Sequence, residues 1–160
     1  MKKISILLVI IMSSCHSKHF EFDNVEHYHI DISDEKVYER AFKSDKSYEE
    51  TLFESILVEN YPAVIDKNFI MKLEEIYPIK QKIDNSKLFE LKEIYCNKIN
   101  FGKSKCIPIY RDVLVFKQKD SIVGVSKICF GCEMQYTINK SGEQKEFDNN
   151  DFKKLKKILK

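Results

Sequence analysis

Hydrophobic and polar residues alternate near the start of the chain, and this alternation predicts a first strand over residues 25–32. Within it, Tyr28 and Ile30 fall on one side, whereas His27 and His29 fall on the other. Alternation with a period of two is typical of a strand that buries only one of its faces.

Two segments that follow carry apolar residues at every third or fourth position, which is the spacing of an amphipathic helix. The first predicted helix covers residues 47–60. It starts at Ser47, whose spacing to Glu50 predicts a capping box, and it stops before Pro62. The second predicted helix covers residues 66–77.

From residue 87 onward the spacing changes back to a period of two. The predicted strands of this half span residues 87–96, 112–117, 121–130, 133–139 and 143–147. Polar turns at 118–120 and 140–142 predict two hairpins, and an amphipathic helix is predicted from about Asn149 to the end. The expected fold is therefore α+β, with N-terminal helices followed by an antiparallel β-meander and a C-terminal amphipathic helix.

The first fifteen residues are not expected to belong to this fold. Lys2 and Lys3 precede an apolar run over residues 4–12, and Ser13, Ser14 and Cys15 follow. A basic start, a short apolar run and small residues form the layout of a secretory signal peptide. The run is too short to cross a bilayer as a helix, so a transmembrane anchor is the less favoured interpretation.

The segment Met12-Ser13-Ser14-Cys15 resembles the lipobox of bacterial lipoproteins, although that family prefers leucine where Met12 stands. The resemblance implies cleavage before Cys15, attachment of lipid to it, and a protein that faces the periplasm on a membrane anchor. His16 replaces the aspartate of the inner-membrane retention signal, which implies the outer membrane. An ordinary secreted protein with a chance cysteine is the alternative.

Length and charge then define the expected domains. The 160 residues include 27 basic and 25 acidic side chains, for a formal charge of +2, and this near-neutral balance argues against a nucleic-acid partner. Loss of residues 1–14 removes two lysines, and five of the remaining lysines lie in the last eight residues. These last residues are expected to form a basic helix, and the rest of the mature chain is acidic. The helix either simply packs on the domain, or its lysines contact anionic lipid headgroups as well. The predicted parts are a signal peptide (1–14), a lipidated cysteine with a tether (15–24) and a single α+β domain (25–160).

Four cysteines remain besides Cys15, and in an exported protein they are candidates for disulfides. They are Cys96, Cys106, Cys129 and Cys132. Sequence alone does not choose among their three pairings; a bond between the first two would close a short loop. The last two form a CxxC motif, for which a structural corner, a redox pair and a metal site all remain open. The corner is the favoured interpretation because neither a helix start nor a second CxxC accompanies the motif.

The segment from Cys106 to Cys132, with its Ile-Cys-Phe-x-Cys run, resembles a group of small, uncharacterised lipoproteins of Gram-negative envelopes. The resemblance covers about the last third of the chain. It implies that Cys106, Cys129 and Cys132 take part in one shared feature, and it implies no activity.

The strand predicted at residues 25–32 also carries a candidate metal site. His27, His29 and Asp31 would project from one face about 7 Å apart, and imidazole and carboxylate groups bind zinc or copper. A solvated polar face without any cofactor is the favoured interpretation, because no further ligand is spaced to complete a site.

No motif of a hydrolase, a metalloprotease, a P-loop protein or a dinucleotide-binding protein occurs in the sequence. The expected function is therefore that of a non-enzymatic binding or interaction module on the envelope, with an unidentified protein or small molecule as its partner. The alternative is a thiol-redox or metal-handling lipoprotein that uses Cys129 and Cys132.

Overall fold

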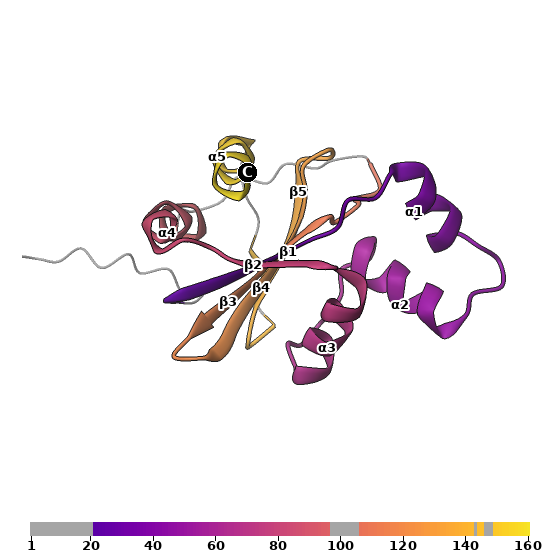
Figure 1. Ribbon diagram of the computed structural model, residues 1–160, viewed down its shortest axis with the longest axis horizontal. Helices are drawn as coiled ribbons and strands as arrows, with labels where there is room; N and C mark the ends of the chain where they lie inside the picture. Colours follow the sequence, from indigo (N-terminus) through magenta and orange to yellow (C-terminus); the bar gives the residue numbers. More distant parts are fainter. Residues whose placement is uncertain (1–20, 97–105, 143, 146–148) are drawn as a thin grey trace, which may run out of the picture.

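One antiparallel sheet lies between two groups of helices in the computed structural model, which describes residues 21–96, 106–142, 144–145 and 149–160 (Figure 1). The strand order is β2-β1-β3-β4-β5-β6. The strands are β1 (Asn24–His29), β2 (Ile79–Lys82), β3 (Asp112–Gln118), β4 (Ser121–Cys129), β5 (Met134–Asn139) and β6 (Gln144–Lys145). The helices are α1 (Asp34–Ala41), α2 (Tyr48–Leu57), α3 (Lys67–Ile76), the 3-10 helix η1 (Asn85–Lys87), α4 (Leu88–Cys96) and α5 (Asn149–Leu159).

Each face of the sheet has its own hydrophobic core. On one face, Tyr28 of β1 and Val113 of β3 pack with residues of α1, α2 and α3. On the other face, Val25 of β1 and Leu114 of β3 pack with residues of α4 and α5. Because side chains alternate along a strand, the odd-numbered residues of β1 face α4 and α5. The predicted α+β class is confirmed, and the predicted order of elements is confirmed only in part.

The elements with strong local signals lie where the sequence places them. The capping box of α2 is present, with the Glu50 amide donating to Ser47 Oγ at 3.2 Å and the Ser47 amide donating to Glu50 Oε2 at 2.8 Å. The β3–β4 hairpin turns through Lys119 and Asp120, whose φ angles of 47° and 64° are the left-handed values that a two-residue hairpin turn requires. These two predictions are confirmed.

The predicted strand at 87–96 is wrong, because these residues form η1 and α4. Leu91, Ile94 and Tyr95 are all buried, and their spacing of three and four places them on one side of a helix against the sheet. Asp84 begins this helical segment by accepting a hydrogen bond from the Ser86 amide at 2.7 Å. The ten residues contain apolar side chains that fit either period, and packing against β3 selects the helix.

The folded part of the chain begins before residue 25, at which the domain was expected to start. Phe22 is 4% exposed, and its ring centroid lies 4.8 Å from that of Phe116. The Asp23 amide also donates to the carbonyl oxygen of Lys117 at 2.9 Å. The last residues of the predicted tether therefore belong to the sheet and its core.

A lysine lies fully buried in the core between β4 and α2. Lys127 Nζ donates to the carbonyl oxygens of Glu59 at 2.6 Å, Tyr61 at 3.1 Å and Ser55 at 3.3 Å, all at or just after the end of α2. It also lies 4.6 Å from the centroid of the Tyr110 ring. Burial lowers the pKa of Lys127 well below its ordinary value, because the charged form is separated from water.

Candidate metal centre

Two histidines of β1 and an aspartate of β3 lie next to each other on the sheet face that α4 and α5 cover. His29 pairs with Asp112 in the register of β1 and β3, and His27 lies two residues earlier on the same strand face. On its other side, His27 pairs with Gln81 of the edge strand β2. Register alone therefore brings together four polar side chains from three strands.

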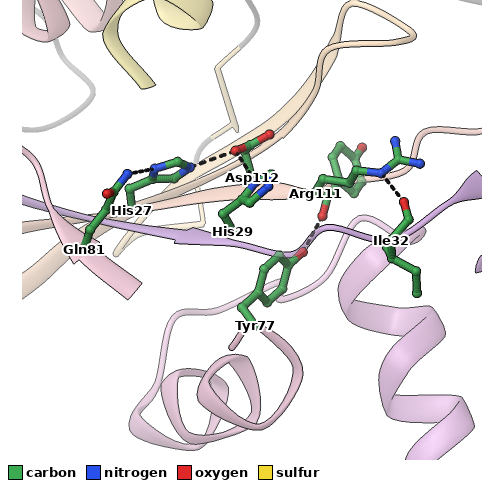
Figure 2. A network of polar contacts seen from close by, with 8 residues as sticks. His27, His29, Ile32, Tyr77, Gln81, Arg111 and Asp112 are labelled. Atoms are coloured by element: carbon green, nitrogen blue, oxygen red, sulfur yellow. Dashed lines mark hydrogen bonds and ion pairs between the residues drawn. The ribbon is translucent and has the colours of Figure 1, made fainter. Parts of the chain in front are cut away.

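The carboxylate of Asp112 joins the two imidazole rings (Figure 2). Its Oδ1 atom lies 2.8 Å from His27 Nε2 and 2.9 Å from His29 Nδ1. The side-chain amide of Gln81 is 2.9 Å from the other ring nitrogen of His27, Nδ1. An ionised carboxylate only accepts hydrogen bonds, so both histidines donate to Asp112 and Gln81 donates to His27.

Neighbouring contacts hold the backbone that carries Asp112. Arg111 Nε donates to the carbonyl oxygen of Ile32 at 2.7 Å, and its guanidinium pairs with Asp34 at the start of α1. Tyr77 OH donates to the carbonyl oxygen of Tyr110, the residue that precedes Arg111. Burial, with a contribution from the negative charge of Asp112, raises the pKa of Tyr77 well above its ordinary value, so this hydroxyl keeps its proton.

The three side chains line one side of a cavity of about 360 Å³. The His27 side chain is 3% exposed and that of Asp112 is 11% exposed, whereas that of His29 is 34% exposed. His27 and Asp112 are thus buried in the protein, whereas His29 is partly exposed, and all three side chains border the cavity. The other residues that line the cavity are Ile79, Gln81, Phe130, Lys156, Leu159 and Lys160.

This arrangement fits a transition-metal ion. One nitrogen of each histidine and one oxygen of Asp112 all lie within 4.8 Å of one another. Two imidazoles and a carboxylate are the donor set that zinc accepts in sites with an open coordination position, and imidazole also suits copper. If His27 binds the ion through Nε2, its Nδ1 proton can be donated to the Gln81 side chain after rotation of the amide, as in the outer contacts of many metal-binding histidines.

The third member of the site is Asp112, not Asp31 as predicted. Strand β1 ends at His29, and Asp31 is exposed in the connection to α1, whose N-cap is Ser33. The prediction extended the alternation of β1 past its end, whereas the neighbouring strand supplies the carboxylate. Asp112 and Gln81 were missed. The one local signal for Asp112 is that it opens strand β3 directly before the apolar run from Val113 to Phe116.

None of the cysteines whose side chains the structure describes belongs to this cluster, and Cys106 and Cys132 form a disulfide with their Cα atoms 6.1 Å apart. Cys129 is a buried free thiol whose Sγ accepts a hydrogen bond from the Ile109 amide at 3.3 Å. The two cysteines of the CxxC motif are therefore not bonded to each other, and Cys106 is not bonded to Cys96. Cys96 ends α4, and its side chain lies outside the described part of the structure.

The Cys106–Cys132 bond is expected to stabilise the fold. Its cysteines are 26 residues apart in sequence. Closing a loop of this length lowers the conformational entropy of the unfolded chain and so raises its free energy by about 3.5 kcal/mol. We expect the C106S/C132S double variant to lose about this much free energy of unfolding, as measured by urea denaturation. A reductant should destabilise the wild type and leave the double variant unchanged. Equal stability of the two proteins without reductant would contradict the assignment.

Cys15, and with it the predicted signal peptide, lies outside the described residues. Among the residues that the structure does describe, none of the helices combines the length and the apolar character needed to cross a bilayer. Comparison of the chain with protein-family models, with curated proteins and with solved structures gives no match.

Proposed function

We propose that this protein is a lipid-anchored envelope protein that binds one transition-metal ion, zinc or copper, through His27, His29 and Asp112. The observation that carries the proposal is the convergence of three metal-binding atoms within 4.8 Å. They come from two paired strands, so the sheet holds them in place before an ion arrives. The cavity beside them gives the ion a route of entry.

The protein acts in this proposal as a binding module and not as an enzyme. Its sequence carries none of the common catalytic motifs. The metal ion would be the species that the module binds, and the sequence alone pointed to it only weakly, through His27, His29 and Asp31. The thiol-redox alternative has less support, because Cys132 is bonded to Cys106 and Cys129 is buried. Reactive thiols are usually accessible and lie in a positive environment.

Zinc titration of the purified protein tests this function. We expect one ion per chain, measured by calorimetry in a buffer that does not coordinate zinc. The Cys129→Ala variant serves as a matched control, because it removes a free thiol that could otherwise bind zinc and leaves the histidines in place. This variant should bind zinc as the wild type does. Failure of the wild-type protein to bind either zinc or copper would overturn the proposal.

The membrane anchor is tested separately at Cys15. We expect the Cys15→Ala variant to leave the membrane fraction and appear in soluble extracts, because several acyl chains each contribute about 0.8 kcal/mol per buried methylene to membrane binding. Fractionation followed by immunoblotting measures the change, with Cys129→Ala as the control that should stay on the membrane. If the Cys15→Ala protein remains membrane-bound, the lipid proposal is wrong.

A further inference from the structure

The cavity beside the metal cluster is larger than a metal ion needs. Its volume of about 360 Å³ lies in the range of sites that hold small organic molecules. Two histidines and an aspartate that binds through one oxygen fill three positions around an ion, and four-coordinate zinc then keeps one position for another ligand. The structure therefore leaves both a coordination position and a space next to it.

The charge of the cavity indicates what can occupy this space. Lys156 and Lys160, near the end of α5, both line the cavity. Asp112 is the only acidic side chain among the described residues that line it. Once a dication is bound, positive charge exceeds negative charge there. The two lysines repel a bare cation, whereas they attract an anion that accompanies it.

Apart from Gln81, the remaining residues that line the cavity are apolar. Phe130 follows β4, Ile79 opens the edge strand β2, and Leu159 ends α5. Ile79 is 47% exposed, although it is a large hydrophobic residue. A hydrated inorganic anion would gain little binding free energy from contact with such apolar surfaces. The hydrocarbon part of an organic anion would cover these surfaces and remove them from water, which favours binding.

We infer that the cavity binds a small organic carboxylate that occupies the open position of the metal ion, with Lys156 and Lys160 balancing its charge. The carboxylate donates an oxygen lone pair to the metal, and its apolar part contacts Phe130 and Leu159. This inference rests on the proposed metal site and extends it, because the natural cargo becomes a metal ion together with a carboxylate ligand.

Cobalt(II) and benzoate provide the test. Cobalt accepts the same ligands as zinc, and its visible absorption reports changes in its coordination. We expect benzoate to change the absorption of the cobalt-loaded protein and to bind more tightly than formate, which lacks the apolar part. In the K156Q/K160Q variant, benzoate affinity should fall by about tenfold, because the variant removes two positive charges that attract the carboxylate, each of which contributes only modestly where water screens it.

The matched control is K153Q/K154Q, which removes two lysines of α5 that do not line the cavity and should keep wild-type benzoate affinity. If cobalt does not bind to the wild-type protein, the proposed metal site is wrong and this inference falls with it. If cobalt binds but benzoate leaves its absorption unchanged, the inference alone is wrong. The same holds if K156Q/K160Q binds benzoate as tightly as the wild type, or if formate binds as tightly as benzoate.

Discussion

Replacing Asp112 with asparagine is expected to weaken zinc binding by about a thousandfold, or about 4 kcal/mol. The change keeps the shape of the side chain and removes the negative charge that Oδ1 shares between His27 and His29. Removing a residue that only hydrogen-bonds to a metal ligand typically lowers metal affinity about 10- to 100-fold. A larger loss is expected for Asp112, because it is proposed to bind the metal directly. Competition with a chromophoric zinc chelator measures the ratio of the two affinities.

The sequence offers a matched control for this variant. Asp31 is exposed beyond the end of β1 and does not belong to the cluster, so Asp31→Asn should bind zinc like the wild type. The two variants carry the same chemical change and the same change in net charge. Equal affinities for Asp112→Asn and the wild type would contradict the proposed ligand set, and so would a large loss in Asp31→Asn.

Replacing Lys127 with alanine is expected to lower the free energy of unfolding by about 4 kcal/mol. The variant leaves a cavity between β4 and α2, and the carbonyl oxygens of Ser55, Glu59 and Tyr61 lose their shared donor. Urea denaturation measures the loss. The matched variant is Lys127→Met, which should lose less stability than Lys127→Ala, because both variants remove the buried amine but Met keeps most of the side-chain volume and leaves a smaller cavity.

The pH dependence distinguishes a buried amine from a simple loss of packing. Burial lowers the pKa of Lys127 in the folded protein, whereas in the unfolded chain it is about 10.4. Between the two values the unfolded chain binds more protons, so stability rises with pH, by at most about 1.4 kcal/mol per pH unit. The stability of the wild type relative to Lys127→Met should therefore increase as the pH rises toward about 10.4, the pKa of lysine in the unfolded chain. A constant or shrinking difference would contradict the lowered pKa.

Local signals explain which elements the sequence could predict. The capping box of α2 and the turn of the β3–β4 hairpin depend on residues within a few positions of each other, so their patterns are complete in the sequence. Segment 87–96 was misassigned because its apolar residues fit two periods, and contact with β3 decides between them. The edge strand β2 was missed because all four of its residues are exposed and show no alternation.

The metal cluster shows the same limit more clearly. The two histidines could be found, because their spacing of two on a predicted strand places them on one face. Asp112 is 83 residues from His29, and the β1–β3 register brings the two together. That register depends on the long-range packing of both sheet faces, and the local periodicity of the sequence carries no information about which strands pair. The same reason explains why Cys132 could not be paired with Cys106 beforehand.

X-ray absorption at the zinc edge of the zinc-loaded protein distinguishes histidine and aspartate ligands from cysteine ligands, because it reports the elements bound to the metal. We expect nitrogen and oxygen neighbours at about 2.0–2.1 Å, with the outer-shell signal of two imidazole rings. Sulfur neighbours at about 2.3 Å would instead place the metal on cysteines and would contradict the assignment to His27, His29 and Asp112.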